Sequence, residues 1–489
     1  MSLPVITGDQ MRAWETASWT LKASVQAVIG LVGDRLAARI KALVPLGSRV
    51  LLLAGKGHNG DDLRAAAPLL KGLDAEIINV HDPVTASERV RNGLAKSPAW
   101  VIDGLFGIGL RGDLTSSWRE ILEMVNTARF PVMAVDIPSG LDADTGEPRG
   151  SAIYARLTIT IGVPKIGLFR TPALPYVGRV EVLSGIGLNP GFKLSSAPGG
   201  DAQLSWTEPR DFLGLTPPRS VSSNKGDFGH LVIIAGSQGY HGAAVLAARA
   251  ATRARPGLVT TLTSPEAYLP VACQMTGTMV APWTGKGGLP PKASAVVVGP
   301  GLAGPEVPEW LRNWVCAEWS QSPIPWIADA SAMDWLRGVS PHPSALRIWT
   351  PHPGEAARLL DLSPSEVQND RFDAARRLSH GIWTVLKGHQ SLVCSPTGEI
   401  HINSSGNPGL AQGGTGDVLA GFIGGLLAQP ALALKPEVTL RYAVWDHGTA
   451  ADRLETLSAP WTPDDLIQQL GLPLSVHQAD PLNPAASAR

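Results

Sequence analysis

The chain has 489 residues, of which 44% are hydrophobic, so it is long enough for two domains that are each stable alone. Its 41 basic and 42 acidic residues give a formal net charge of -1. This balance excludes the strong positive field that attracts nucleic acid or acidic membranes, so any anionic ligand must be held by local geometry.

The cysteine content and the hydropathy of the chain indicate the cellular compartment in which the protein works. The three cysteines lie far apart without the spacing of a metal site, which favours packing in a reduced interior. The first residues lack a basic segment followed by an apolar core, and no apolar run reaches the roughly 18 residues of a spanning helix. We therefore expect a soluble, cytoplasmic protein without nucleic-acid or membrane partners.

The first half of the chain alternates apolar runs with helical segments. One amphipathic helix is expected at 8–43, ahead of the first apolar run. Alternation of this kind predicts a parallel sheet with helices on both faces, which binds ligands at the carboxyl ends of its strands. The expected strands are 49–54, 76–80, 100–103, 132–136 and 157–161.

Glycines and polar side chains gather at three of these strand ends. The strands run into GKGHNGDD (55–62), DGLFGIG (103–109) and DIPSGLD (136–142). Oxygen atoms from Asn59, Asp103 and Ser139 suit a hard cation. Asp136 can move a proton on a bound substrate. Turns and helix caps use the same residue types, but three such loops in register favour a shared pocket.

The first half resembles the NAD(P)H-hydrate epimerase family, on the motifs VIDGLFGIGL, VDIPSGLDADTG and YVGRVEV. The resemblance implies a Rossmann-like three-layer sandwich that interconverts the R and S hydrates of NADH and NADPH at C6. It also implies a bound potassium ion on Asn59, Asp103 and Ser139. Asp136 matches a substrate-binding position and a catalytic acid or base. The other substrate-binding positions that it implies are His58, Asn59, Asp62, Gly107, Ile108, Gly109 and Asp113.

The first loop departs from that family's pattern. The family has a string like GxGNNGGDG, whereas this chain has GKGHNGDDL, with His58, Asp61 and Leu63 in place of an asparagine and two glycines. Asp61 adds a side chain and a charge where backbone is expected to approach the ligand. The opening helix also lacks the glutamate that usually precedes Ala-Gly. The alternative for this half is a non-catalytic scaffold.

A connection separates the two halves. Residues 188–224 are rich in proline, serine and glycine and show little apolar periodicity, which is typical of a linker. We place the boundary so that the domains span 1–203 and 204–489. A second alternation then predicts strands at 231–235, 258–262, 295–298, 326–328, 347–349 and 384–386, helices at 243–253, 437–454 and 462–470, and a tail without periodicity at 478–489.

The stretch GNPGLAQGGTGD (406–417) leads into an apolar helix expected at 418–428. Glycines here allow close backbone approach, and the amides of Gly414 to Gly416 at a helix N-terminus favour an anion. A bound phosphate would repel Asp417 in the same turn. We therefore expect Asp417 to take a proton from the group that receives the phosphate, although such an aspartate alone often only caps a helix.

Two further strand ends of the second half carry candidate residues. His352 lies between two prolines that stiffen its loop, and Glu355 follows in the first turn of a helix, where its charge is favourable. Lys387 ends a strand before a glycine and can hold the phosphates or ribose of a nucleotide. A structural histidine and an exposed lysine are the ordinary alternatives.

The second half resembles the ADP-dependent NAD(P)H-hydrate dehydratase family, a relative of ribokinase-like kinases. The motifs NKGDFGHLVIIAGS, VVVGPGL, TPHPGEAARLL, TVLKG and the glycine-rich stretch occur in the family's order. The resemblance implies a ribokinase-like α/β domain that binds the hydrate at Ala243, Gly301, His352 and Asp417. It implies ADP at Lys387, Gly388, His389, Gln390, Ser391 and Gly416, to which the loop chemistry adds Gly414.

The chemistry of such a reaction agrees with these residues. Hydroxide is a poor leaving group, so phosphorylation of the C6 hydroxyl lets the ring nitrogen expel it as phosphate. We expect ADP as co-substrate with Mg²⁺, AMP and phosphate as products, both NADH and NADPH hydrates as substrates, and a homo-oligomer. A kinase of a small vitamin-like alcohol is the alternative for this half.

Overall fold

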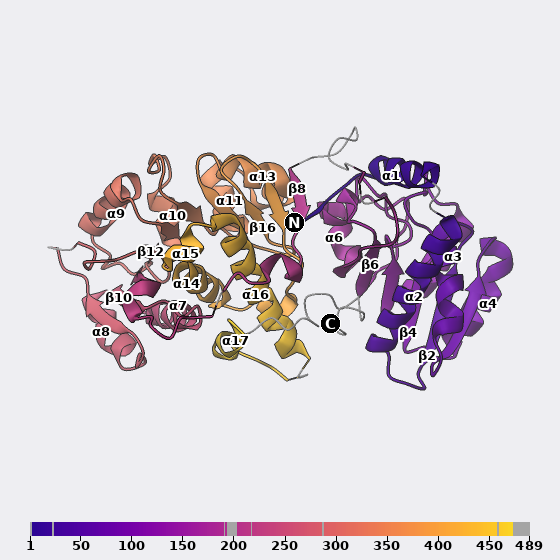
Figure 1. The fold of residues 1–489 in the computed structure, drawn as a ribbon, viewed down its shortest axis with the longest axis horizontal. Coiled ribbons are helices and arrows are strands. Elements are labelled where there is room, and N and C mark those ends of the chain that lie inside the picture. The colour runs from indigo at the N-terminus through magenta and orange to yellow at the C-terminus, as the bar shows by residue number, and fades with distance from the viewer. Residues whose placement is uncertain are drawn as a thin grey trace. The chain divides into compact units, whose positions relative to one another are not determined.

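The computed structural model describes residues 2–21, 24–189, 191–192, 203–216, 218–285, 288–456 and 459–472. The chain forms two compact units, Met1–Trp206 and Thr207–Leu474, and both are α/β, as predicted (Figure 1). The assignment of 1–203 and 204–489 as two functional domains stays a prediction. The tail expected at 478–489 lies outside the described residues.

The first unit holds a six-stranded parallel sheet in the order β3-β2-β4-β5-β6-β7. Its five predicted strands are confirmed, and β7 is an addition. The strands are β2 (Arg49–Ala54), β3 (Asp74–Asn79), β4 (Trp100–Gly104), β5 (Val132–Val135), β6 (Leu157–Ile161) and β7 (Arg179–Leu183). A short β1 (Leu3–Pro4) pairs antiparallel with β8 (Leu204–Trp206).

The helices of this unit are α1 (Gly8–Thr20), α2 (Val25–Leu43), α3 (His58–Ala66), α4 (Pro83–Ala95), α5 (Ser116–Ala128) and α6 (Leu174–Val177). The single helix expected at 8–43 is wrong. The hydroxyl of Ser24 accepts a hydrogen bond from the Ala27 amide at 3.3 Å and starts α2 as a separate helix. An N-cap serine of this kind satisfies an amide that has no partner inside the helix.

Alternation along the strands builds three layers. Val50 and Leu52 of β2 join the core that includes residues of α2 and α3, whereas Leu51 and Leu53 join the core that includes residues of α4 and α5. Successive side chains of a strand point to opposite faces, so one apolar run supplies both cores. The three-layer sandwich that the sequence predicts is therefore confirmed.

The second unit holds a longer sheet, in which the order β17-β16-β15-β14-β13-β12-β9-β10-β11 runs from antiparallel to parallel pairs. The predicted strands are confirmed, and β11, β16 and β17 are additions. The strands are β9 (His230–Ile234), β10 (Leu258–Thr263), β11 (Met279–Pro282), β12 (Ala295–Val298), β13 (Trp326–Ala328), β14 (Arg347–Trp349), β15 (Trp383–Leu386), β16 (Leu392–Cys394) and β17 (Ile400–Ile402).

Helices again cover both faces of this sheet. Leu231 and Ile233 of β9 join a core with α7 and α14, whereas Val232 and Ile234 join a core with α9. The helices are α7 (His241–Arg253), α8 (Pro265–Ala272), α9 (Glu309–Gln321), α10 (Ser331–Trp335), α11 (Pro353–Leu360), α12 (Pro364–Asn369), α13 (Arg371–Leu378), α14 (Thr415–Leu427), α15 (Pro430–Ala433), α16 (Pro436–Glu455) and α17 (Pro463–Gln469).

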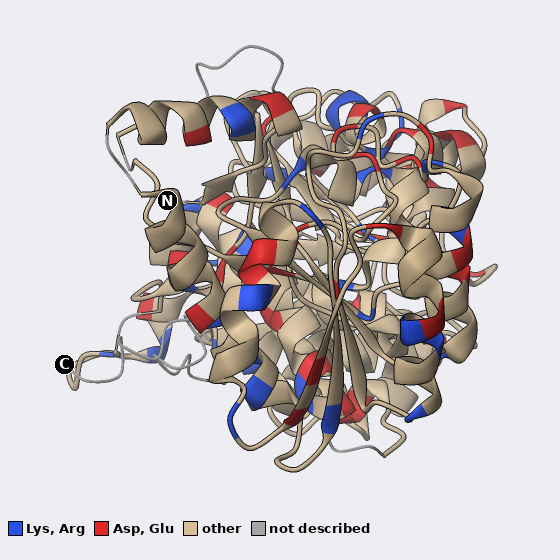
Figure 2. Cartoon of the chain, turned by 90° about the vertical axis from the view of Figure 1, so that its right-hand side faces the viewer, with Lys and Arg blue, Asp and Glu red and all other residues tan. Residues whose placement is uncertain are grey.

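The distribution of charged residues agrees with the charge balance of the sequence. In Figure 2, basic and acidic residues are interspersed along the helices and loops. Among the helices of the described residues, none combines the length and the apolar character that crossing a membrane requires.

We predict that Gly421→Ala destabilises the second unit by about 3 kcal/mol. A Cβ at Gly421 would lie 2.0 Å from the carbonyl oxygen of Ala247, so α7 and α14 would have to separate. Gly242→Ala in α7 is the matched control, because nothing lies within 4 Å of its Cβ position. Urea unfolding followed by tryptophan fluorescence measures both, and an unchanged midpoint for Gly421→Ala would contradict the close packing.

Candidate active sites

A cavity of about 710 Å³ lies where the strands of the first sheet end. Its wall includes segments that follow β2, β3, β4, β5 and β6. Most of the predicted substrate positions line it, namely His58, Asn59, Asp62, Gly107, Ile108, Gly109 and Asp136. Asp113 is exposed and is not part of this lining. The structure thus brings the predicted loops together, and the role of each residue stays a prediction.

Two of the three departures in the first loop lie outside this cavity, whereas the third, His58, lines it. Asp61 turns to Arg64, with 2.7 Å between Oδ1 and Nη2, and Leu63 is buried in the core. Neither Asp61 nor Leu63 lines the cavity, whereas the neighbouring Asp62 does. The charge that the sequence places in the loop is therefore directed away from the ligand space.

The three predicted cation ligands lie together below the loop after β4. Ser139 donates from Oγ to Asp103 Oδ1 at 2.6 Å and from its amide to Oδ2 at 2.8 Å. Asn59 donates from Nδ2 to the carbonyl oxygens of Phe106 and Val135, at 2.6 and 2.9 Å. These contacts hold the oxygens of three loops in one place.

The same residues fit a potassium ion. Asn59 Oδ1 is buried and has no hydrogen-bond partner among the described residues. Burial raises the pKa of Asp103 to about 6, although hydrogen bonds from Ser139 and Leu105 oppose the shift. An unpaired buried oxygen and a desolvated carboxylate are both costly, and a bound cation would relieve both.

Lys165 and Glu15 are among the charged residues of this cavity that sequence reasoning missed. Lys165 is fully buried, and its Nζ lies 2.5 Å from Asp136 Oδ1. Burial raises the pKa of Glu15, and burial with the charges of Asp136, Asp61 and Glu15 raises the pKa of Asp62 to about 8. One signal was available, since Lys165 is a lone charge in the apolar segment that follows β6.

The second candidate site surrounds the start of α14. Gly414 is the N-cap residue, with φ +98°, and Asp417 lies in the first turn, as predicted. Burial raises the pKa of Asp417 to about 7, the charges of Asp329 and Glu355 add to the shift, and Lys387 opposes it. A carboxylate with this pKa is suited to take a proton at neutral pH.

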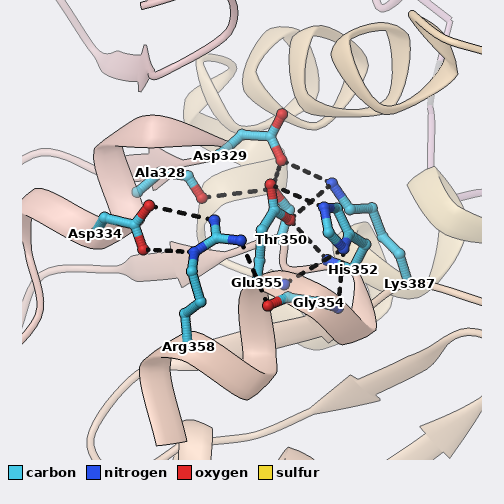
Figure 3. A network of polar contacts seen from close by, with 9 residues as sticks. All are labelled: Ala328, Asp329, Asp334, Thr350, His352, Gly354, Glu355, Arg358 and Lys387. Carbon is cyan, nitrogen blue, oxygen red and sulfur yellow. Dashed lines mark hydrogen bonds and ion pairs between the residues drawn. The ribbon is translucent and has the colours of Figure 1, made fainter. Parts of the chain in front are cut away.

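Lys387 connects the strand ends of this site (Figure 3). Its Nζ lies 2.9 Å from Asp329 Oδ1 and 3.8 Å from Glu355 Oε2. Thr350 Oγ1 donates to the same Asp329 oxygen at 2.6 Å. A Cβ at Gly416 would lie 3.4 Å from Nζ, so the ammonium lies next to the glycine-rich loop. Sequence reasoning gave Asp329 no role.

His352 serves first as a helix cap. Its Nδ1 accepts hydrogen bonds from the amides of Gly354 and Glu355 at 3.0 and 3.3 Å, and Glu355 Oε2 accepts from the His352 amide at 2.8 Å. This reciprocal cap satisfies amides at the start of α11. The ring Nε2 of His352 lies 3.5 Å from Glu355 Oε1. The His352 side chain is half exposed, which leaves room for the predicted contact with the hydrate.

The remaining predicted positions fall into two groups. Ala243 and Gly301 are neighbours, because a Cβ at Gly301 would lie 3.0 Å from that of Ala243. The loop after Lys387 is held from below by Arg371, which donates to the carbonyl oxygens of His389 and Gln390 at 2.6 and 3.3 Å. Gly388, His389 and Ser391 are exposed or half-exposed, whereas Gln390 is buried.

Helix α16 supports the glycine-rich loop, a contact that sequence reasoning did not predict in detail. Asp452 accepts hydrogen bonds from the Gly406 amide and Asn407 Nδ2 at 3.1 and 3.2 Å. His447 Nε2 lies 3.0 Å from the carbonyl oxygen of Thr415. These contacts fix both ends of the loop that leads to Asp417.

Each unit therefore places carboxylates and a lysine paired with one of them at the carboxyl end of its sheet, which defines an α/β enzyme with two sites. Two family models match the chain: a YjeF-related protein N-terminus over 79–167, and an NAD(P)H-hydrate dehydratase over 231–471.

Curated relatives cover both units. The bifunctional NAD(P)H-hydrate repair enzyme Nnr of Coxiella burnetii is 34% identical over 445 residues, which cover 85% of this chain and 88% of that protein. The enzyme of the same name from Escherichia coli is 35% identical over 429 residues, which cover 83% and 80%. The chain belongs to the family of bifunctional NAD(P)H-hydrate repair enzymes, which confirms the predicted family and fold class.

One solved structure that this chain resembles is an ADP/ATP-dependent NAD(P)H-hydrate dehydratase from Bacillus subtilis, co-crystallised with ATP and Mg²⁺. It is 29% identical, with a TM-score of 0.47, and the match covers 52% of this chain and 93% of that one.

We predict that Asp62→Asn stabilises the first unit at pH 8 and leaves it nearly unchanged at pH 4. The unfolded chain releases the Asp62 proton near the ordinary value of 3.8, whereas the folded chain keeps it up to about 8. Stability is therefore lost as the pH rises through this window, and asparagine removes the loss.

Thermal unfolding of the full chain at both pH values tests this expectation. Asp61→Asn is the matched control, because Asp61 is a neighbouring carboxylate that is paired with Arg64 and lies outside the cavity. A stabilisation of Asp62→Asn that does not depend on pH would contradict the assignment.

Proposed function

We propose that the second unit uses ADP to dehydrate the S hydrates of NADH and NADPH, and that the first unit supplies them by epimerising the R hydrates. The observation that carries the proposal is the Asp417 carboxylate, placed at the N-terminus of α14 with a pKa near neutrality. Family membership supports the same pair of reactions.

Dehydration begins when Asp417 takes the proton of the C6 hydroxyl. The hydroxyl oxygen then attacks the β-phosphorus of ADP, and the bond to AMP breaks. The ring nitrogen expels phosphate from C6, and loss of a proton from C5 restores the dihydropyridine. The reaction consumes ADP and the hydrate and releases AMP, phosphate and NADH or NADPH.

The chain stabilises the phosphoryl group during transfer. The amides of Gly414 to Gly416 and the ammonium of Lys387 provide positive charge at one place. No group of three or more His, Cys, Asp or Glu side chains in the described ranges could hold a metal ion. We therefore assign Mg²⁺ to the phosphates of the nucleotide, where it would offset their charge.

Epimerisation requires that a bond to C6 break and form again on the other face of the ring. Once the C6 hydroxyl receives a proton, the ring nitrogen can expel it as water. Asp62 is suited to give this proton because its raised pKa keeps it protonated at neutral pH. Asp136 then takes a proton from the water that adds to the opposite face. Potassium on Asn59, Asp103 and Ser139 would place a positive charge below the substrate loop.

The direct test is to incubate the protein with mixed R and S hydrates of NADH, ADP, Mg²⁺ and K⁺, and to follow NADH absorbance. Full recovery supports both activities. Recovery that stops at the S fraction would return the first unit to the scaffold reading, and no recovery would return the second unit to the kinase reading.

We predict that Asp417→Asn lowers the dehydration rate by about 10²- to 10³-fold while the chain stays folded, because no base remains. In the wild type, the rate should fall as the pH drops through about 7, where Asp417 becomes protonated. Steady-state rates with pure S hydrate between pH 5.5 and 8.5 measure both effects. Ordinary turnover by the variant would contradict the role.

We predict that K⁺ accelerates the conversion of the R hydrate and leaves dehydration of the S hydrate unchanged. Asp103→Asn should remove this dependence, because the site loses its charged ligand. Rates in potassium and in tetramethylammonium chloride at equal ionic strength make the comparison. Equal R conversion in both salts would contradict a potassium site.

A further inference from the structure

Lys165 is a charged group of the first unit that the reaction above does not use. Its side chain is fully buried, and it also lines the cavity. Nζ lies 2.5 Å from Asp136 Oδ1 and donates to the carbonyl oxygen of Ile161 at 2.6 Å. A buried ammonium is costly unless it is paired and hydrogen-bonded, so this placement requires its partners.

The two oxygens of Asp136 have different surroundings. Oδ1 accepts hydrogen bonds from Lys165 Nζ, the Ile161 amide at 3.1 Å and Thr160 Oγ1 at 3.3 Å. Oδ2 lies 3.5 Å from the Cβ position of Gly107, in the predicted substrate loop. Three donors on one oxygen prevent the carboxylate from rotating, so the other oxygen is held toward the substrate loop.

The backbone fixes both partners. Asp136 has φ +66°, a left-handed conformation that a residue other than glycine adopts only where its surroundings enforce it. The Ile6 amide donates to the carbonyl oxygen of Pro164 at 2.9 Å, and the Ile166 amide donates to that of Ile6 at 2.8 Å. Lys165 is thus held between two backbone hydrogen bonds.

We propose that Lys165 is a positioning residue for epimerisation, which fixes Asp136 Oδ1 so that Oδ2 meets the proton that it must take. This inference rests on the proposed function of the first unit. Charge supports it as well, because Glu15, Asp62 and Asp136 share one cavity. The charge of Lys165 opposes the burial that raises the pKa of Glu15 and Asp62.

The first test is Lys165→Met in the full chain. We expect kcat for R conversion to fall by about 100-fold with little change in KM, since a misplaced base slows the chemical step more than binding. Dehydration of pure S hydrate by the second unit reports whether the chain is otherwise functional. Lys96→Met is the matched control, because Lys96 pairs with Glu76 at 2.9 Å on the surface.

The second test covers the case in which Lys165→Met fails to fold, since it leaves a buried carboxylate without a partner. The double variant Asp136→Asn/Lys165→Met removes both buried charges and avoids that state, and its rate is compared with that of Asp136→Asn. If Lys165 acts through Asp136, the two should convert the R hydrate at rates within about twofold of each other. Circular dichroism tests whether both variants are folded.

The outcomes distinguish a failure of the positioning role of Lys165 from a failure of the proposed epimerisation by the first unit. A wild type that does not convert the R hydrate in K⁺ would overturn the proposed function. An active wild type with unchanged kcat in folded Lys165→Met would overturn the positioning role alone. A double variant much slower than Asp136→Asn would also overturn it, because Lys165 would then act independently of Asp136.

Discussion

A lysine held among carboxylates, fully buried in one unit and partly buried in the other, is the arrangement on which both sites depend. Lys165 pairs with Asp136 in the first unit, and Lys387 pairs with Asp329 in the second. Each pair joins residues from the ends of different strands, so neither exists until the sheet has formed. Desolvated charges interact strongly, which is how one ammonium can influence several neighbouring carboxylates. The parallel sheets supply the place, because their helices cover both faces and leave the strand ends for ligands.

Backbone strain lies beside the same groups. Asp136 has φ +66°, and Ala330, directly after Asp329, has φ +48°. Conformations of this kind are costly for residues with side chains, and they persist only where packing enforces them. Both occur just after a strand ends, where the chain must turn sharply while the carboxylate keeps its direction. In both units, a residue with positive φ at the end of a strand lets the chain turn while the carboxylate stays directed toward the site.

The sequence allowed most of the fold to be predicted, for a physical reason. Strands that are buried on both faces are continuous apolar runs, so 49–54 and 295–298 could be located from composition. The strands β16 and β17 were not predicted, because they are short and interrupted by turns. The separation of α1 from α2 depended on a single cap at Ser24.

The site was predictable where it follows from strand ends, and not where it follows from packing. Asp103 lies at the end of β4, and Asn59 and Ser139 lie in the segments that follow β2 and β5, so their meeting was expected. Lys165 meets Asp136 only through the turn after β6, which no spacing rule describes. The Asp61 side chain points away from the cavity because it pairs with Arg64, one helical turn later in the chain. The loop sequence alone does not show this pairing.

The hydrogen bonds that hold Lys165 also give the order in which the first site is completed during synthesis. Ile6 lies against residues 164–166, and Leu3–Pro4 pair with Leu204–Trp206. Residues 3–6 are therefore made before their partners, which follow about 160 positions later at 164–166 and about 200 positions later at 204–206. At roughly 5–20 residues per second, the wait is on the order of 10–40 s on the ribosome. During that interval residues 3–6 lack the backbone partners that they have in the folded chain.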